Sequence, residues 1–225
     1  MCNRACLQFA AAHLTTEDVA GCRVLEVGAR DVNGSVRLLL EDLAPSKYIG
    51  VDIEAGPGVD QVCDIGELVA TFGAERFDVV VCTEVLEHVR DWRGALSNLK
   101  HVLVSGGTLL VTTRSIGFRY HGYPYDFWRY EPDDVDVLLG DMTIRAVERD
   151  PIAPGIFVKA MKPSRFEEVD LVEYRLHSVI TGRRCRDVTD GEIRWFLRVK
   201  RPMTRFFRRM AKSIRKRLPR RVVDE

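Results

Sequence analysis

Two glutamates and a histidine follow a short apolar segment in the middle of the chain. Residues 77–81, Phe-Asp-Val-Val-Val, are rich in β-branched side chains and predict a buried strand. Glu84, Glu87 and His88 come soon after it, and a helical turn opening there would place them on one face. Carboxylate oxygens and an imidazole suit Mg²⁺, Mn²⁺ or Zn²⁺. Glu also favours the start of a helix without any ligand, so the motif alone leaves a solvated helix start as the alternative.

The size and composition indicate one good-sized domain with an appendage. The chain has 225 residues, of which 46% are hydrophobic, so it can bury a sizeable core. No apolar run reaches the roughly 18–20 residues of a spanning helix, and the N-terminus lacks the apolar region of a signal peptide. The six cysteines are scattered, which is typical of reduced thiols. These features predict a cytoplasmic protein.

The charge of the chain is strongly asymmetric. The net charge is +1, but residues 194–221 hold 13 Lys/Arg and no Asp/Glu. The other residues hold 21 Lys/Arg and 33 Asp/Glu, so an acidic body precedes a basic tail. This pattern predicts an interaction partner for the tail and does not bear on the fold.

Strand and helix patterns alternate through the body of the chain, which favours a parallel sheet with helices on both faces. The expected strands are 23–28, 48–53, 60–65, 77–81 and 108–113. The expected helices are 4–13, a short turn capped by Thr15 or Thr16, one near 38–43, 68–72 and 92–104. In such open sheets, ligands bind beyond the carboxyl ends of the strands.

A glycine and two acidic residues stand at successive strand ends. Gly28 ends the first expected strand after Glu26, and Asp52 lies 24 residues further on, near the spacing of about 20 residues at which an acid meets a ribose hydroxyl. Asp64 follows at the third strand end. Arg30 occupies the place of the second glycine of a dinucleotide loop. A ligand with an adenosine and no pyrophosphate therefore fits better than a nicotinamide dinucleotide.

These residues resemble the class I S-adenosylmethionine-dependent methyltransferases over about residues 20–160. Residues 24–28, Val-Leu-Glu-Val-Gly, resemble the first motif of that family, and 50–53, Gly-Val-Asp-Ile, the second. The segment 77–81 with Thr83 resembles the fourth motif, and 103–110 with its Gly-Gly turn resembles the fifth-strand signature. Arg30 in the glycine loop departs from the pattern.

The resemblance implies S-adenosylmethionine as cofactor and a Rossmann-like sheet of seven strands. The last two strands would form an antiparallel hairpin, 142–147 and 155–161, after a helix beginning near Pro132. The methyltransferase domain would span 1–162. The implied cofactor-binding residues are Glu26, Gly28, Arg30, Asp52, Ile53, Asp64, Ile65 and Thr83.

Within this family, Glu-Val-Leu-Glu-His is similar to the metal-binding Glu-x-x-Glu-His of small-RNA 3′-terminal 2′-O-methyltransferases and resembles the ubiquinone-pathway O-methyltransferases. In the RNA enzymes a further histidine after the fifth strand completes the site. His121 is the corresponding candidate, so the implied metal ligands are Glu84, Glu87, His88 and His121. Mg²⁺ is preferred, with Mn²⁺ or Zn²⁺ as alternatives. Glu-His-Val also occurs in relatives with no known metal.

An aromatic segment, 117–130, follows the fifth expected strand. Loops of this composition on a rigid scaffold are typical binding elements, and a lid or a homodimer contact is the alternative. Its Tyr-Pro-Tyr-Asp-Phe-Trp-Arg stretch also resembles bacterial methyltransferases of glycan and polysaccharide assembly. The candidate substrate-binding residues are Tyr120, Tyr123, Tyr125, Asp126, Trp128 and Arg129.

The resulting hypothesis is O-methylation of a hydroxyl on a sugar, oligosaccharide or polysaccharide precursor. A divalent ion held through Glu87 would lower the hydroxyl pKa, and without an ion His88 or His121 would act as general base. The closest rival is an RNA 3′-terminal ribose 2′-O-methyltransferase. A third alternative is a non-catalytic adenosyl-binding subunit or scaffold.

The extension 163–225 departs from the family pattern and predicts helices. One is expected over 168–180, and another capped by Thr189 or Asp190. After Pro202, apolar residues recur at helical spacing among Arg and Lys, as in a basic amphipathic helix. Such a helix fits an anionic membrane surface or a polyanion, which would make the protein peripheral at the membrane. Packing on the acidic body or on a second subunit is the alternative.

Overall fold

The chain separates into two compact units, residues 1–187 and 188–225. The structure is a computed structural model that describes residues 3–32, 34–122 and 124–203. The boundary was expected after residue 162. Residues 163–187 belong to the first of the two compact units.

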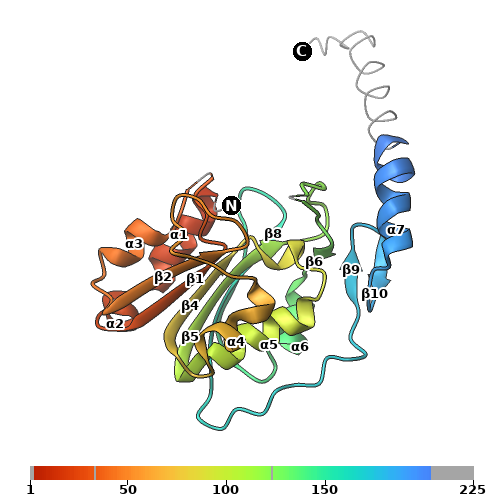
Figure 1. Ribbon diagram of the computed structural model, residues 1–225. Helices are drawn as coiled ribbons and strands as arrows, with labels where there is room; N and C mark the ends of the chain where they lie inside the picture. Colours follow the sequence, from red (N-terminus) through yellow and green to blue (C-terminus); the bar gives the residue numbers. More distant parts are fainter. Residues whose placement is uncertain (1–2, 33, 123, 204–225) are drawn as a thin grey trace, which may run out of the picture. The chain divides into compact units, whose positions relative to one another are not determined.

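The first unit is organised around one sheet of seven strands, shown in Figure 1. The order is β3-β2-β1-β4-β5-β8-β7. Strands β3, β2, β1, β4 and β5 pair in parallel, and β8 runs antiparallel to both β5 and β7. The bounds are β1 Arg23–Val27, β2 Lys47–Asp52, β3 Gln61–Val62, β4 Phe77–Thr83, β5 Leu103–Arg114, β7 Thr143–Arg149 and β8 Gly155–Met161. The predicted Rossmann-like sheet with a final hairpin is confirmed.

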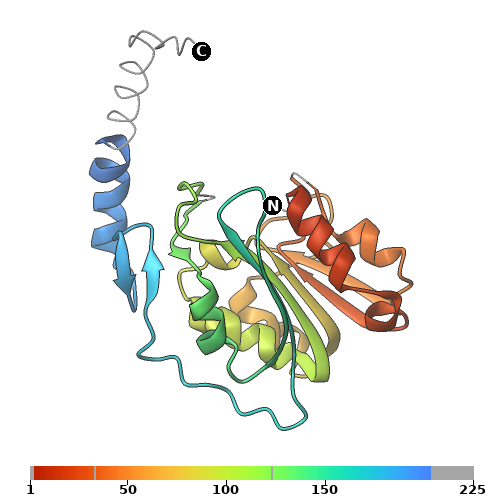
Figure 2. The same ribbon diagram turned by 180° about the vertical axis from the view of Figure 1, so that it is seen from behind.

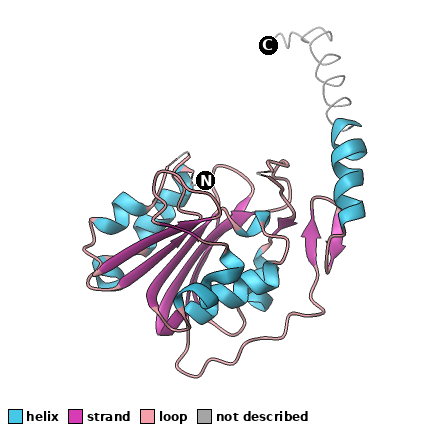
Figure 3. Ribbon diagram, viewed as in Figure 1, coloured by secondary structure: helices cyan, strands magenta, loops and turns pink. Residues whose placement is uncertain are grey.

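Helices cover both faces of this sheet, as Figures 2 and 3 show from opposite sides. The bounds are α1 Arg4–His13, α2 Thr16–Val19, α3 Arg37–Glu41, α4 Leu68–Phe72, α5 Trp92–Val102 and α6 Pro132–Leu138. Because side chains alternate along a strand, Leu110 of β5 packs in the cluster with α1 and α3. Its neighbour Val111 faces the space lined by residues of α5 and α6.

Local side-chain chemistry explains where the helices begin. The Asn3 side chain accepts a hydrogen bond from the Cys6 N–H, 2.9 Å away, at the start of α1. Thr15 and Asp18 form a capping box on α2, as the sequence predicted. Asp91 caps α5. Pro132 begins α6, where its missing N–H costs nothing.

Two strand predictions differ from the structure. The third strand shrinks to Gln61–Val62, because the Asp64 side chain accepts from the Gly66 N–H and opens a 3₁₀ turn. The fifth strand begins early, at Leu103. The chain bulges between the pairs Phe77–Leu103 and Val79–Thr108, with Gly106 at φ +80°.

The helix expected over 168–180 is wrong. Residues 163–175 form a long loop without regular structure, and β9, Leu176–Ser178, follows it (Figure 3). The Arg93 guanidinium donates to the Leu171 and Tyr174 carbonyls at 2.8 and 2.7 Å, which satisfies backbone acceptors that a helix would otherwise use. Strand β9 lies between β6, Trp128–Arg129, and β10, Arg183–Cys185.

The second unit begins with α7, Asp190–Trp195. Thr189 and Glu192 form a capping box at its start, which confirms the predicted cap. The helix continues through a π-helical turn, Phe196–Lys200, to residue 203. The rest of the predicted basic helix lies outside the described residues. In residues 3–32, 34–122 and 124–203, no helix has the length and apolar character needed to cross a membrane.

Candidate functional site

The predicted cofactor residues lie along one edge of the sheet. Strands β1, β2 and β4 run in parallel, with Val27 beside both Val51 and Cys82. Their carboxyl ends therefore meet, and the residues that follow face the same side. This arrangement brings together the ends at which Glu26, Gly28, Asp52 and Thr83 stand, as the sequence predicted.

The loop after β1 requires glycine at position 28. Gly28 has φ +81°, a conformation that L side chains rarely adopt. A Cβ there would lie 2.2 Å from Val85 Cγ2, so the chain beyond β4 crosses directly over this glycine. The Gly28 and Ala29 N–H groups both donate to the Val51 carbonyl, at 2.9 and 3.0 Å. These contacts hold the loop against the end of β2.

Glu26 lies buried beneath this loop. Its carboxylate accepts from the Tyr48 hydroxyl at 2.8 Å and from Ser35 Oγ at 3.3 Å. Burial raises the pKa of Glu26 to about 7, against the opposing effect of these two hydrogen bonds. The same burial and the adjacent carboxylate raise the pKa of Tyr48. In this geometry the Glu26 side chain supports the loop from below.

The Asp52 carboxylate is oriented by two backbone donors at the end of β2. Its Oδ2 accepts from the Arg30 N–H at 3.3 Å, and its Oδ1 accepts from the Glu54 N–H at 3.1 Å. Arg30 itself pairs with Glu54, and its side chain lies across Gly56, where a Cβ would come within 2.9 Å of Arg30 Nε. Arg30, which stands where a dinucleotide loop would have its second glycine, therefore links the loops after β1 and β2.

The remaining predicted cofactor residues differ in accessibility. Ile53 is half exposed beside Asp52. Asp64 uses one oxygen to cap the turn after β3, and Ile65 is buried within that turn. The Thr83 side chain is buried at the end of β4. Ile53 and the backbone edges therefore offer more contact surface to a ligand than the Ile65 and Thr83 side chains do.

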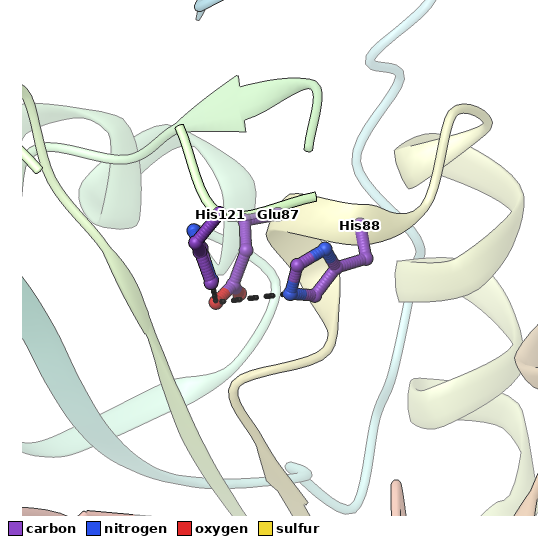
Figure 4. Close-up of side chains that lie close together, drawn as sticks. All are labelled: Glu87, His88 and His121. Atoms are coloured by element: carbon purple, nitrogen blue, oxygen red, sulfur yellow. Dashed lines mark ion pairs between the residues drawn. The ribbon is translucent and has the colours of Figure 1, made fainter. Parts of the chain in front are cut away.

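Three side chains converge beyond β4, as Figure 4 shows. Glu87 and His88 belong to the 3₁₀ turn η2, Leu86–His88, and His121 comes from the loop after β5. One ligand atom from each of the three lies within 4.8 Å of the others. Glu87 Oε1 lies 3.9 Å from His88 Nε2 and 3.6 Å from His121 Nε2. We call these three residues the Glu87 cluster.

The outer ring nitrogens fix how both histidines face the cluster. His88 Nδ1 lies 2.6 Å from the Tyr125 carbonyl, which only accepts, so this nitrogen carries the hydrogen. His121 Nδ1 lies 2.9 Å from Asp126 Oδ2. In the neutral rings both Nε2 lone pairs therefore point toward Glu87 Oε1, the arrangement typical of metal-ligating histidines.

Only one carboxylate oxygen of Glu87 accepts a hydrogen bond from a described residue. Its Oε2 accepts from Thr113 Oγ1 at 2.8 Å, while Oε1 is buried and has no hydrogen-bond partner among the described residues. Oε1 instead has longer ion-pair contacts with the two imidazoles, and a cation bound between them would neutralise this buried charge more fully. The donor set of one carboxylate and two imidazoles fits a divalent metal ion.

The charges of the cluster are strongly perturbed in the metal-free chain. Burial disfavours the Glu87 carboxylate, but His121 and His88 outweigh it and lower the pKa of Glu87 to about 2. Burial also opposes the charge of His121, whereas Asp126 and Glu87 raise the pKa of His121 to about 9. At neutral pH the proton of His121 thus occupies the place that a metal would take.

The prediction that Glu84 shares a helical face with Glu87 and His88 is wrong. Glu84 has φ +57°, which turns the chain sharply before η2 begins. Its side chain is buried on another side, where it pairs with Arg114 and accepts from Thr112 Oγ1 at 3.1 Å. Burial raises the pKa of Glu84, and the Arg114 charge opposes that rise. Glu84 is therefore not part of the Glu87 cluster.

The aromatic segment is only partly accessible, which corrects three predicted substrate contacts. Trp128 is fully buried, and its Nε1 donates to the Val89 and Arg90 carbonyls. Asp126 and Arg129 are buried and bind each other through two contacts of 2.5 and 2.8 Å. These side chains support His121 and the loop.

The other predicted substrate residues divide further. Tyr125 is exposed and carries the carbonyl that orients His88. Tyr120 is half-buried, with its ring against Gly122. Tyr123 lies outside the described residues. Among the described residues of the predicted set, Tyr125 therefore has the most accessible aromatic side chain.

Sequence reasoning missed the residues that orient the cluster from β5. Thr113 holds Glu87, Arg114 holds Glu84, and Asp150 in the β7–β8 turn holds Arg114 at 2.9 Å. The only signal was a run of polar residues, Thr112 to Ser115, at the end of an otherwise apolar strand. Polar residues at a strand's carboxyl end indicate a site, but pairing partners distant in sequence are not readable from the run.

The fold and this strand-edge site define the class of protein. Residues 3–137, more than half of the chain, match the family model described as "Methyltransferase domain". The chain therefore belongs to this family and is a class I S-adenosylmethionine-dependent methyltransferase. Its cofactor is S-adenosylmethionine.

Solved structures share this fold at low sequence identity. A 1,6-didemethyltoxoflavin-N1-methyltransferase from Burkholderia thailandensis, bound to S-adenosylhomocysteine, is 17% identical with a TM-score of 0.59, covering 72% of this chain and 79% of that one. A methyltransferase from Mesorhizobium loti is 18% identical with a TM-score of 0.52, covering 69% and 100%. The [4+2]-cyclase SpnF is 16% identical with a TM-score of 0.55, covering 71% and 80%. The fold thus serves more than one reaction.

One curated relative is named as an O-methyltransferase, an enzyme that methylates an oxygen atom. The chain is 34% identical over 70 residues to a ubiquinone biosynthesis O-methyltransferase of Parvibaculum lavamentivorans. This match spans 31% of the chain and 27% of the relative. It covers too little of either protein to assign an acceptor.

Proposed function

We propose that this methyltransferase transfers the methyl group to a hydroxyl of a sugar, oligosaccharide or polysaccharide precursor, with a divalent metal held by the Glu87 cluster. The observation that carries the proposal is the convergence of His88 Nε2 and His121 Nε2 on the buried Oε1 of Glu87. The partial similarity to an O-methyltransferase supports an oxygen acceptor.

A hydroxyl needs activation because its pKa lies far above 7. A divalent ion supplies this activation when bound, by lowering the pKa of a coordinated hydroxyl and orienting its oxygen. The residues that would hold it are Glu87, His88 and His121, and two imidazoles beside one carboxylate suit Mn²⁺ or Zn²⁺ better than the Mg²⁺ that the sequence favoured. Asp126 and the Tyr125 carbonyl hold the Nδ1 side of the two imidazoles, which leaves both Nε2 atoms on the side of Glu87 Oε1.

The cluster also indicates what happens to protons. His121, with a pKa raised to about 9, is protonated at neutral pH and is a poor proton acceptor in the metal-free chain. His88 is therefore the better candidate for a general base if no metal takes part. Methyl transfer is in line, so the remaining task of the chain is to position the sulfonium and the acceptor oxygen.

The acceptor surface favours a carbohydrate through one exposed aromatic ring. Tyr125 is 39% exposed, and its backbone carbonyl accepts from His88 Nδ1, so this residue borders the cluster through its backbone. An aromatic face can stack on the apolar face of a sugar. A nucleic-acid ribose offers similar hydroxyls, and the basic tail favours this second candidate, an RNA 3′-terminal 2′-O-methyltransferase. The acidic body, however, does not suit a nucleic-acid groove.

The test is a radiolabelled methyl-transfer screen on the full chain with S-adenosylmethionine. The acceptors are monosaccharides, oligosaccharides and short RNA, each with EDTA or with added Mg²⁺ or Mn²⁺. We expect transfer to a carbohydrate that EDTA abolishes and metal restores. Transfer to RNA alone selects the second candidate, and transfer that is indifferent to EDTA overturns the metal role. Cofactor binding without transfer to any acceptor selects a non-catalytic adenosyl-binding scaffold.

A further inference from the structure

Glu84 is adjacent to the Glu87 cluster in sequence but belongs to a separate set of contacts. Its Oε1 accepts from Thr112 Oγ1 at 3.1 Å, and its Oε2 pairs with Arg114 Nε. The Glu84 N–H donates to the Thr112 carbonyl at 2.8 Å, which ties its backbone to β5 as well. Both carboxylate oxygens are therefore used inside the protein.

Arg114 connects Glu84 to two distant parts of the unit. Its NH1 lies 2.9 Å from Asp150 Oδ2 in the β7–β8 turn. The same Asp150 oxygen accepts from Asn3 Nδ2 at 3.1 Å, and Asn3 caps α1. Arg114 is 4% exposed. We call these four residues the Arg114 network; it joins the start of α1 to the ends of β4 and β5.

We infer that Arg114 withdraws Glu84 from the metal site, so that the chain supplies three ligands, Glu87, His88 and His121. The part of this inference that concerns the metal rests on the proposed function. Divalent ions in catalytic sites take more than three ligands, and the positions that the protein leaves open bind water or substrate. A three-ligand site fits an acceptor with two adjacent oxygens, such as a vicinal diol, better than a four-ligand site does. Arg114 is thus a positioning residue that determines how many open positions the acceptor meets.

The test measures Mn²⁺ binding to the full chain by calorimetry, without turnover. We expect the Kd of Glu84→Gln to stay within about threefold of wild type, and that of Glu87→Gln to rise more than about tenfold. Equal weakening by both substitutions overturns the inference. Absence of Mn²⁺ binding by the wild type overturns the metal part of the proposed function and, with it, the ligand count.

The pairing of Glu84 with Arg114 is tested separately by thermal unfolding. Breaking a buried ion pair is strongly destabilising, so Glu84→Gln should lower Tm by about 10 °C. Arg114→Met also removes the partner of Asp150, so the double variant Glu84→Met/Arg114→Met is compared with Glu84→Met and Arg114→Met, and its loss should be smaller than the sum of theirs. It also provides a folded chain for the Mn²⁺ titration. Strictly additive losses overturn the pairing.

The C-terminal unit presents exposed apolar side chains next to cations. Trp195, Val199 and Met203 recur every fourth residue along the helix, with exposed fractions of 54%, 40% and 52%. Arg194 and Arg198 are also exposed and lie beside this apolar stripe in the helical sequence. The stripe and its cations define one amphipathic, basic face.

The composition of the surrounding sequence extends this character. Residues 194–221 hold 13 Lys/Arg and no Asp/Glu. A base of RNA can stack on Trp195, but the aliphatic side chains of Val199 and Met203 gain little from RNA, whereas a lipid interface accepts all three apolar groups and the cations. We propose, independently of the reaction, that the helical face formed by residues 194–203 binds the surface of a membrane containing anionic lipids. Electrostatic attraction would bring the helix to the headgroups, and Trp195 would enter the interface.

The test is co-sedimentation of the full chain with vesicles of phosphatidylglycerol and phosphatidylcholine in equal parts, or of phosphatidylcholine alone. We expect binding to the anionic vesicles only, and loss of that binding at high salt. Arg194→Gln/Arg198→Gln should weaken it about thirtyfold, because each cation near the surface contributes about fivefold. The charge-matched control Lys47→Gln/Arg76→Gln removes exposed cations of the first unit and should leave it unchanged.

Three outcomes overturn this proposal. One is equal binding to both kinds of vesicle, and another is equal weakening by the two double variants. The third is binding to short RNA with no binding to either vesicle, which assigns the segment to nucleic acid.

Discussion

His121 lies between two carboxylates, one on each ring nitrogen. Its Nδ1 lies 2.9 Å from Asp126 Oδ2, and its Nε2 lies 3.6 Å from Glu87 Oε1. Asp126 is fully buried and is itself paired with Arg129. The Asp126 contact fixes which ring nitrogen faces the cluster and raises its basicity. The tautomer that a metal would require is therefore built into the chain.

This relationship predicts that Asp126→Asn weakens metal binding although Asp126 is not a ligand. The amide keeps the shape of the carboxylate but removes the charge that favours a donor at Nδ1. We expect Mn²⁺ affinity to fall by about 10–100-fold. Calorimetric titration measures this. The exposed Asp133→Asn serves as a charge-matched control and should bind like wild type. A folded Asp126→Asn with unchanged affinity would contradict the orienting role.

Replacing Gly28 by alanine should destabilise the protein more than replacing Gly21, although the two glycines have similar φ angles. Gly21 and Gly28 have φ +72° and +81°, but a Cβ at Gly21 meets nothing within 4 Å, whereas at Gly28 it lies 2.2 Å from Val85 Cγ2. Gly21→Ala should cost about 1 kcal/mol for the left-handed backbone. Gly28→Ala should cost a further 1–3 kcal/mol, roughly, for overpacking.

Urea unfolding of both variants measures these free energies. Adding Val85→Ala to Gly28→Ala removes the clashing methyl groups and should return part of the stability. Equal costs at the two glycines would show that the crossing of Val85 over Gly28 is relieved at little cost.

The raised pKa of Glu26 should make the stability of the protein depend on pH. Folding raises its pKa from 4.5 to about 7, so between these values the folded state holds a proton that the unfolded chain has lost. This contribution favours folding least above pH 7, and stability falls as pH rises through the window. The shift corresponds to about 3 kcal/mol. Glu26→Gln removes the penalty and keeps an acceptor for Tyr48.

Urea unfolding at pH 5 and pH 8 separates this effect from packing. The gain of Glu26→Gln over wild type should be larger at pH 8 by about 2–3 kcal/mol. The exposed Glu67→Gln is the control and should show no comparable change. A gain that is equal at both pH values would indicate that Glu26 is ionised in the folded chain.

The sequence allowed the main sheet to be predicted because the strands are apolar runs bounded by turn residues. The paired register of Val27 with Val51 and Cys82 follows from those runs, and it places the strand ends together. The site was harder, because it depends on one backbone angle. A helix from Glu84 would have aligned both glutamates, but φ +57° at Glu84 separates them. Nothing local in Thr-Glu-Val predicts that turn, since Val85 crossing Gly28 is a tertiary contact.

The aromatic segment shows the same limit. The resemblance to the RNA methyltransferases indicated His121, which lies beside Glu87 and His88, but composition could not separate rings that face solvent from rings that pack inside. Trp128 is buried because β6 pairs with β9, a strand about fifty residues later in a region that helical spacing assigned to a helix. The error in one element therefore produced the error in the other.

Substitutions of Trp128 and Tyr125 should have opposite effects: the first should change the stability and the second the KM for the acceptor. Trp128 is fully buried, and its indole donates to the Val89 and Arg90 carbonyls at 3.0 and 3.2 Å. Trp128→Phe should lower the free energy of unfolding by about 1–3 kcal/mol and leave KM for the acceptor found in the methyl-transfer screen within about twofold. Tyr125→Ala should leave stability within about 0.5 kcal/mol and raise that KM, because its exposed ring is not part of the core.

The two variants are compared by urea unfolding and steady-state kinetics on the same preparations. A KM raised by Trp128→Phe at unchanged stability would restore Trp128 as a substrate contact, and a Tyr125→Ala variant with wild-type KM would remove the stacking surface from the proposed acceptor site.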